Sequence, residues 1–282
     1  LPGVWVLIGG LWVAHFAYWG FNQYITQRAL GAKSLPEAQK GVMFAAFLKL
    51  LMPIVVVLPG ICAVVLIPQL DSPDTAYPAM MGLLPSGLLG LTFAALIAAI
   101  VSSLASMTNS VSTIFTMDIY KQFLSEQVDE RKLVVVGRNV ALISIVVAAL
   151  CAQPLLGNLE SAFQYIQNFT GFFTPGILVI FLVALFWKKA TSLSVLVAAL
   201  ASLILSIAMF MFAPDDFPFQ HRMGIVFLVT GFLCYMTALV QGYTDQEKAV
   251  DLNSINFQTS KGFNISTLVI LVILIIIYSV WW

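Results

Sequence analysis

Long apolar stretches, each about the length of a membrane-spanning helix, limit the possible folds of this chain more than any other feature. A helix needs about 20 mostly apolar residues to cross a bilayer. Eight stretches qualify: Val4–Leu30, Gln39–Ile67, Leu88–Phe123, Lys132–Cys151, Leu159–Phe186, Ser192–Phe212, Met223–Gln241 and Phe263–Trp282. Because a helix pairs its backbone polar groups within the segment, it is the expected structure for such stretches in lipid. We therefore predict an all-α, polytopic membrane protein with eight spans.

The composition supports a bilayer as the surroundings and argues against several classes of protein. Hydrophobic residues make up 60% of the 282 residues and charged residues 9%, whereas soluble domains carry about 25% charged residues. A net charge of zero gives no reason to expect a nucleic-acid partner. The three cysteines lie apart in apolar stretches, so we expect buried thiols and not a disulfide or zinc site. The sequence contains no G-x-S-x-G, H-E-x-x-H or P-loop motif, so we do not expect an enzyme.

Basic residues are distributed unequally between alternate loops, which predicts the orientation in the membrane. Eleven of the thirteen fall on one side: Arg28, Lys33, Lys40, Lys121, Arg131, Lys132, Arg138, Lys188, Lys189, Lys248 and Lys261. Arg222 falls on the other side, and Lys49 lies within a span. The basic side is expected to be cytoplasmic. With eight spans, both ends of this chain then face outward from an inner or plasma membrane.

Three of the predicted spans contain residues that interrupt helices. The first contains Gly9-Gly10 and Trp19-Gly20, the second Pro53 and Pro59-Gly60, and the fifth Gly171 and Pro175-Gly176. Glycine and proline are tolerated within spanning helices where neighbours or a water-filled cavity satisfy the backbone groups they release. Interrupted helices near the middle of a bilayer are typical of transporter binding sites.

Lys49 is the one charged side chain placed deep within a predicted span. It lies about ten residues into Gln39–Ile67, which is about 15 Å along a helix and close to the middle of a bilayer. An ammonium group there costs at least a few kcal/mol unless it has partners. The alternative is that the side chain extends to the cytoplasmic interface. We favour a polar cavity, in which an ammonium donor suits hydroxyl-rich or anionic solutes.

Small and hydroxylated residues form a stripe along Leu88–Phe123. The carbonyl of Ala99 and the hydroxyls of Ser102 and Ser103 are spaced at i, i+3 and i+4 and so share one helix face. Close helix packing through small residues explains the alanines. The clustered hydroxyls also fit a site for a hard cation such as sodium, which prefers oxygen ligands.

Other polar and aromatic residues lie deep within the first and fifth predicted spans. His15, Tyr18 and Trp19 lie about 15 residues into the first span, too deep for an interfacial aromatic belt, and could line a cavity. Gln164 and Gln167 share a face of the fifth span, where either interhelical hydrogen bonds or a polar cavity would satisfy them. The pair His221-Arg222 is expected in an outer loop without a functional role.

Five motifs resemble the solute:sodium symporter family, most closely its bacterial sodium/galactose (sodium/glucose) cotransporters. They are Trp19–Arg28 (WGFNQYITQR), Lys49 within Phe-Leu-Lys-Leu, Ser102–Ser106 (SSLAS) followed by Ile114–Tyr120 (IFTMDIY), Phe163–Gln167 (FQYIQ), and Phe186–Lys189 (FWKK). The resemblance extends over essentially the whole chain. It implies sodium-coupled symport of a galactose-like or glucose-like sugar by alternating access.

The resemblance also implies an inverted-repeat fold of five plus five helices. On this basis residues 1–187 form the second five-helix repeat, and residues 188–282 form three peripheral spans. The first repeat is expected to lie outside this sequence, as a missing N-terminal part of the same protein. Each site would then be only partly present in this chain.

The resemblance assigns roles to individual residues. Ala99 (through its carbonyl), Ser102 and Ser103 would hold sodium. The solute-binding set would be Lys49 and Gln167, which would hydrogen-bond sugar hydroxyls, with His15, Tyr18 and Trp19. Within that set Tyr18 would cover the sugar on the inner side, beside Trp19.

Two positions depart from the family pattern. His15 stands where the galactose carriers have an asparagine that contacts sugar, which leaves the exact substrate open. Ala105 stands where family members that bind a second sodium have a hydroxyl, so we expect one sodium per solute. The alternatives are a carrier for an inositol, an amino acid or an acidic sugar, and a membrane sugar sensor without net transport.

Overall fold

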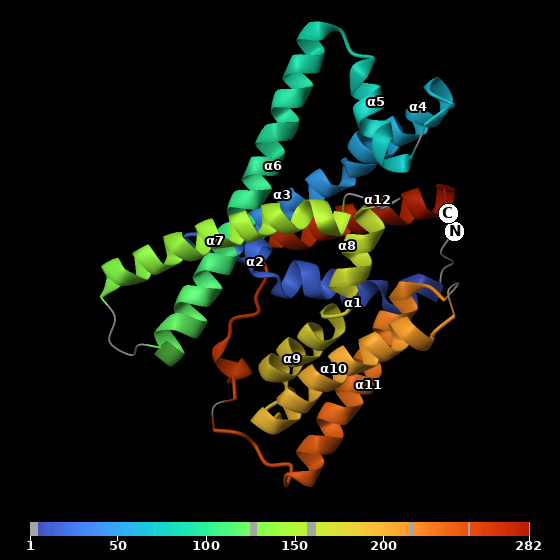
Figure 1. Cartoon of the computed structure of the whole chain (residues 1–282). Helices are drawn as coiled ribbons and strands as arrows, with labels where there is room; N and C mark the ends of the chain where they lie inside the picture. Colours follow the sequence, from blue (N-terminus) through green and yellow to red (C-terminus); the bar gives the residue numbers. More distant parts are fainter. Residues whose placement is uncertain are drawn as a thin grey trace. The chain divides into compact units, whose positions relative to one another are not determined.

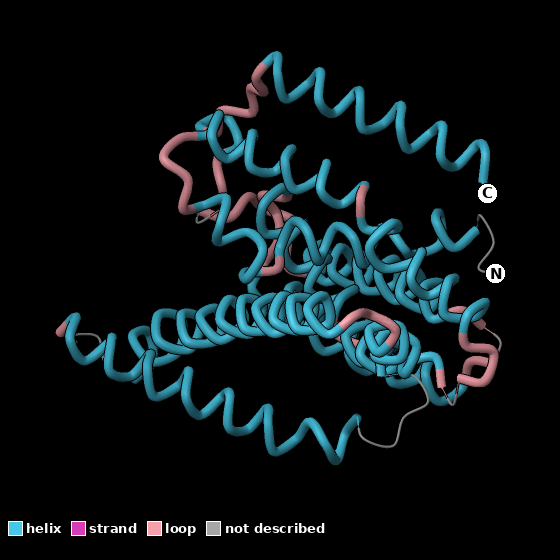
Figure 2. Tube along the Cα trace, turned by 90° about the horizontal axis from the view of Figure 1, so that it is seen from above, coloured by secondary structure: helices cyan, strands magenta, loops and turns pink. Residues whose placement is uncertain are grey.

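The computed structural model describes residues 5–70, 72–124, 129–156, 162–214, 217–247 and 249–281, and within these residues it contains helices and connecting turns but no strand (Figures 1 and 2). The all-α prediction is confirmed. The chain divides into two compact units, each described by itself below. The first unit contains Leu1–Leu30 and Phe163–Ser260, and the second contains Gly31–Ala162 and Lys261–Trp282.

Six helices of the described residues are long and apolar enough to cross a bilayer. They are Leu35–Leu66, Ser86–Phe123, Glu130–Pro154, Ser192–Phe212, Phe219–Val240 and Lys261–Val280. A seventh span results if Phe163–Gly171 and Thr174–Phe186, which are bent by 44° to each other, are taken together. The prediction of a multi-pass membrane protein is confirmed. The described residues contain six such spans, or seven with the bent pair, and not the predicted eight.

The difference lies in the first predicted span, Val4–Leu30, which is not one helix. Residues 1–4 lie outside the described residues. The helical segments are η1 (Leu7–Leu11), α1 (Trp12–Phe16), η2 (Ala17–Phe21) and, after a break, α2 (Gln23–Leu30). At the break Asn22 has extended backbone angles (φ −80°, ψ 118°). The apolar helix Leu7–Phe21 is therefore shorter than the span predicted from hydropathy, because a polar residue that caps the next helix ends it.

Most helices of the second unit pack in pairs. Its elements are α3 (Leu35–Leu50), η3 (Pro53–Val57), α4 (Leu58–Leu66), η4 (Pro73–Thr75), α5 (Ala76–Gly82), α6 (Ser86–Ile114), η5 (Phe115–Leu124), α7 (Glu130–Leu156) and α12 (Lys261–Trp281). The α6 and α7 helices approach closely where Ser112 Oγ donates a 2.7 Å hydrogen bond to the carbonyl of Gly137. A Cβ atom at Gly137 would lie 3.0 Å from that Oγ atom, so a small residue is needed there. The α12 helix packs on α3, where Thr267 Oγ1 lies 3.5 Å from the Sδ atom of Met43.

The first unit is built around α9, α10 and α11, which lie side by side in Figure 1. Its remaining elements after α2 are α8 (Ala162–Gly171), α9 (Thr174–Phe186), α10 (Ser192–Phe212), α11 (Phe219–Val240) and η6 (Leu252–Ser254). The buried face of α10 carries a small residue at every fourth position: Ser194, Ala198, Ser202 and Ser206. The facing residues of α11 are also spaced by four: Val226, Thr230, Cys234 and Ala238. Small residues let helix backbones approach closely, and this packing matters in a membrane because the hydrophobic effect does not drive helices together in lipid.

A very close backbone approach in this unit joins η1 to α11 through glycines. A Cβ atom at Gly10 would lie 1.8 Å from the carbonyl oxygen of Gln220, and one at Gly224 would lie 1.5 Å from the carbonyl oxygen of Gly9. Real Cβ atoms do not approach backbone so closely. Only glycine therefore allows this crossing, which places α1 against α9 and α11.

We expect Gly224→Ala to destabilise the folded protein by at least about 1–3 kcal/mol, the usual cost of overpacking, because two backbones would have to separate. The amount of monodisperse full-length protein recovered from membranes, and its thermal unfolding, measure the effect. Gly231→Ala on the same helix is the matched control, since a Cβ atom there meets no atom within 4 Å. Equal stability of the two variants would contradict this packing.

Candidate functional site

The residues predicted to bind solute and sodium are divided between the two units. Lys49 lies in the second unit, together with the sodium set Ala99, Ser102 and Ser103. The first unit contains His15, Tyr18, Trp19 and Gln167. Each group is considered within its own unit.

Lys49 lies in the last turn of α3, directly before the helix becomes irregular. The residue four positions further on is Pro53, which has no N–H and cannot donate to the Lys49 carbonyl as a regular helix requires. Beyond it the helix continues with π geometry over Pro53–Val57. A positive charge at the C-terminal end of a helix is favourable, since the carbonyl groups concentrate partial negative charge there. The break predicted from Pro53 is thus confirmed, and Lys49 lies directly before it in the middle of a 32-residue apolar span.

The predicted sodium residues lie together on α6. Helical side chains tilt toward the N-terminus, so the hydroxyls of Ser102 and Ser103 lean toward the turn that carries the Ala99 carbonyl. All three residues are exposed on this helix, as a site shared with other parts of a protein would require. The next hydroxyls turn back to the helix: Ser106 Oγ donates to the Ser102 carbonyl and Ser110 Oγ to the Ser106 carbonyl, both at 3.0 Å. Three neutral oxygens on one face are fewer than the six to eight oxygen ligands that a hard cation such as calcium takes, so these residues alone do not make a complete cation site.

His15, Tyr18 and Trp19 share the exposed side of the broken first helix. The opposite side is buried, because Val13 and Ala17 pack with Leu178 of α9 and Met223 of α11. This packing fixes the rotation of the helix and leaves the polar and aromatic residues uncovered within the unit. The sequence motif predicted their depth in the span but not which side they would occupy.

Tyr18 and Trp19 contact each other immediately before the helix break at Asn22. Their rings meet edge to face, with centroids 5.4 Å apart. The hydroxyl of Tyr18 also contacts the hydroxyl of Tyr24, which lies beyond the break on α2. Asn22 holds the new helix start, since its Oδ1 atom accepts a 3.3 Å hydrogen bond from the Tyr24 N–H. Tyr24 was not predicted as a site residue, although it stands in the same motif.

Gln167 lies exposed on α8, one turn before the bend between α8 and α9. The bend follows from Pro175, which cannot donate to the carbonyl of Gly171 four residues earlier. Two hydroxyls satisfy carbonyls at the bend: Thr174 Oγ1 donates to Thr170 at 2.8 Å, and Thr170 Oγ1 donates to Gln167 at 3.0 Å. The predicted irregularity of this span is confirmed.

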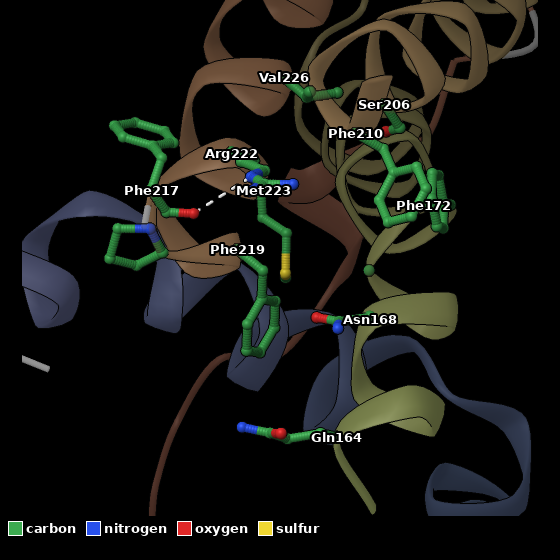
Figure 3. Close-up of a pocket in the computed structure, with 12 residues that line it drawn as sticks. Gln164, Asn168, Phe172, Ser206, Phe210, Phe217, Phe219, Arg222, Met223 and Val226 are labelled. Atoms are coloured by element: carbon green, nitrogen blue, oxygen red, sulfur yellow. Dashed lines mark hydrogen bonds between the residues drawn. The ribbon is translucent and has the colours of Figure 1, made fainter. Parts of the chain in front are cut away.

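A cavity of about 250 Å³ lies next to α8, between α8 and the neighbouring ends of α10 and α11 (Figure 3). Its polar lining consists of Gln164, Asn168, Ser206 and Arg222, and four phenylalanines and Met223 contribute most of the remaining surface. A polar cavity beside Gln164 was one of the two alternatives considered above, but Asn168 and not Gln167 shares its lining. The amide groups of Gln164 and Asn168 both point from α8 toward the cavity in Figure 3.

Arg222 was expected in an outer loop, and this expectation is wrong. The α11 helix begins at Phe219, directly after Pro218, so Arg222 lies in its first turns. Its guanidinium group donates to two carbonyls of the preceding loop, Phe217 at 3.2 Å and Pro214 at 3.1 Å. The proline, a common residue at a helix start, could have revealed this boundary in the sequence.

Comparison with known proteins shows similarity along the whole chain. The model of the sodium:solute symporter family matches residues 3–205. The sodium/glucose cotransporter of Vibrio parahaemolyticus is 47% identical over 301 residues, covering 100% of this chain and 55% of that protein. The uncharacterized symporter YidK of Escherichia coli is 28% identical over 96% of this chain and 48% of its own length. The human sodium/myo-inositol cotransporter 2 is 33% identical over 73% of this chain and 33% of its own length. The chain thus spans about half the length, or less, of these relatives.

We expect a cysteine at position 49 to react with a charged, membrane-impermeant thiol reagent if Lys49 faces a water-filled cavity. The Lys49→Cys variant would be made in full-length protein after replacing Cys62, Cys151 and Cys234. Leu51→Cys is the matched control. Residue 51 is two positions after residue 49, so its side chain points about 200° away around the helix at nearly the same depth. Labelling is measured by mass spectrometry. Unreactive cysteine at both positions would mean that the Lys49 side chain reaches the interface along lipid.

Proposed function

Because this multi-pass membrane chain belongs to the sodium:solute symporter family, we propose that its full-length protein carries a sugar across the membrane together with sodium. The observation that carries the proposal is the 47% identity to the Vibrio sodium/glucose cotransporter, which extends over the whole of this chain. The family match extends over residues 3–205, which include every residue predicted to bind solute or sodium. Transport of this kind moves solute through a conformational change and makes no covalent bond.

In this proposal the solute binds beside the breaks in the helices. Lys49 and Gln167 hydrogen-bond sugar hydroxyls, while Tyr18 and Trp19 lie against the sugar and His15 faces it. Support comes from the exposure of these side chains within their units and from the helix breaks beside four of them, at Asn22 and near Pro53 and Pro175. Irregular backbone at membrane depth is tolerated where it lines a water-filled cavity, and such a cavity admits a hydroxyl-rich solute.

The proposed sodium ligands are the Ala99 carbonyl and the hydroxyls of Ser102 and Ser103 on α6. Neutral oxygens suit a monovalent hard cation, because they bind it without retaining it as strongly as carboxylates would. Each sodium that moves inward across 100 mV contributes about 2.3 kcal/mol in addition to its concentration gradient. That energy drives solute uptake because sodium and the solute cross the membrane in the same conformational cycle.

The proposal also includes the orientation of the protein in the membrane and the division of the chain into core and peripheral helices. The basic loops face the cytoplasm, which places the start of α8 and of α11 and the end of α10 toward the outside. Residues 1–187 form the second repeat of the transporter core, and residues 188–282 are peripheral.

A second candidate solute is an inositol. The similarity to sodium/myo-inositol cotransporters, 36% over 67% of this chain for the bovine protein, favours it. Inositol and glucose are both ringed polyols of similar size, and His15 changes the hydrogen-bonding pattern in the expected sugar site. Competition between the two solutes for uptake distinguishes these candidates.

Uptake of labelled glucose and galactose by proteoliposomes that contain the full-length protein tests the proposed function. We expect an inward sodium gradient to drive accumulation and an equal potassium gradient to drive none. Ser103→Ala should raise the half-saturating sodium concentration at least about tenfold, the effect of losing about 1.4 kcal/mol from one ligand. Ser103→Thr keeps the hydroxyl and serves as the control. Sodium-independent accumulation, or an unchanged sodium requirement in Ser103→Ala, would exclude the proposed coupling site.

One sodium per sugar is expected, because Ala105 supplies no hydroxyl for a second ion. Simultaneous measurement of charge movement and labelled-sugar flux in voltage-clamped cells or vesicles should give a ratio near one. The same ratio at two membrane potentials would confirm that no uncoupled leak contributes. A ratio near two would contradict the assignment.

A further inference from the structure

The cavity between α8, α10 and α11 is lined by polar and aromatic residues that have no role in the proposed transport site. None of the five residues proposed to bind the transported solute lines it. It belongs to the first unit alone, so its walls are fixed by the packing of neighbouring helices. Its nearest proposed transport residue along the chain is Gln167, which lies on the same helix as Gln164 and Asn168 but is absent from the lining.

A buried hydroxyl without a partner indicates that this cavity is suited to a polar ligand. Ser206 is only 8% exposed, and among the described residues no group hydrogen-bonds its Oγ atom. Leaving a buried hydroxyl unpaired costs about 1–3 kcal/mol. The Oγ atom itself has almost no accessible surface, so a ligand hydroxyl removes that cost only when the serine side chain rotates toward the cavity, and an apolar ligand does not remove it.

Arg222 presents a fixed donor group on the opposite wall. Two of its five N–H groups are used by the carbonyls of Phe217 and Pro214, which hold the planar guanidinium in place. The amides of Asn168 and Gln164 on α8 add both donors and acceptors (Figure 3). The described lining contains no carboxylate and no cation other than this guanidinium.

Aromatic rings cover much of the remaining cavity wall. Phe172 of α8–α9 and Phe210 of α10 meet edge to face with centroids 5.3 Å apart, and Phe217 and Phe219 lie on the α11 side. Rings of this kind can pack against the apolar face of a pyranose while polar groups bind its hydroxyls. A volume of about 250 Å³ is below the usual range of ligand pockets, about 300–1,000 Å³, so the cavity has room for a small ligand such as one monosaccharide and not for a larger one.

We propose that this cavity is a second monosaccharide-binding site, separate from the transport site. The choice of a sugar rests on the proposed function, while the cavity, the unpaired hydroxyl and the mixed amide and guanidinium lining are independent of it. With the proposed orientation the site lies at the outer ends of α8, α10 and α11. A sugar held there binds without sodium, because the positive guanidinium group of Arg222 in the lining repels a second cation.

Saturation-transfer NMR with glucose, in sodium-free buffer, tests this site in the purified full-length protein. The Lys49→Ala background weakens the transport site, so that the remaining signal reports the second site. We expect the signal to persist in Lys49→Ala, to disappear when Ser206→Leu is added, and to fall at least about fivefold when Asn168→Ala is added, as for a lost hydrogen bond. Met211→Phe is the matched control, because it adds bulk on the exposed side of the same end of α10.

The outcomes separate this proposal from the proposed function. Sodium-driven uptake by the unmodified protein, combined with complete loss of the glucose signal in Lys49→Ala, overturns the second site and leaves the function standing. An unchanged signal in both Ser206→Leu and Asn168→Ala also overturns it. Thermal unfolding detects misfolding of Ser206→Leu, in which case Asn168→Ala decides, since Asn168 is exposed and does not support the helix packing.

Discussion

The need to satisfy every backbone polar group in lipid is the constraint on which the rest of this structure depends. It makes the chain helical, and it also makes each interruption of a helix expensive. Side chains near two of the interruptions form hydrogen bonds with the backbone groups there. Asn22 caps the helix that follows it, and the hydroxyls of Thr170 and Thr174 bind carbonyls at the α8–α9 bend. Three of the interruptions, at Asn22 and near Pro53 and Pro175, lie beside residues proposed to bind solute.

Packing through small residues decides which side of each helix remains available. The glycine crossing of η1 and α11 and the buried stripe of α10 bring backbones close together in the first unit. Once Val13 and Ala17 are buried in this unit, helical geometry leaves Tyr18 and Trp19 on the opposite side. The position of the proposed binding surface is thus a consequence of packing on the other face, and a change in the packing would rotate it.

The two proposed ligands require different chemistry, and the residues reflect it. Sodium is assigned neutral oxygens on a regular helix, where a carbonyl and two hydroxyls share a face through spacing alone. The solute is assigned a cation, an amide and aromatic rings at irregular positions. The cavity beside α8 has a related mixture of amide, guanidinium and aromatic groups, which is why a sugar is its proposed ligand. Since the chain spans about half of its relatives' length, the sites described are partial surfaces of the whole protein.

The sequence by itself determined the helical membrane fold, the sites of helix interruption at Pro53 and Pro175, and the family. These follow from length, hydropathy and missing N–H groups, which are local properties. It also predicted an irregular first span from Gly9-Gly10 and Trp19-Gly20, and the structure has non-helical backbone angles at Gly10 and a break after Phe21. It did not show that this span divides into separate helices at Asn22, because hydropathy averages over one polar residue. Nor did it reveal the cavity with Ser206 and Arg222, whose residues are distant in sequence and are brought together when α8, α10 and α11 pack. Tertiary structure alone decided these features, since they depend on which helix faces meet.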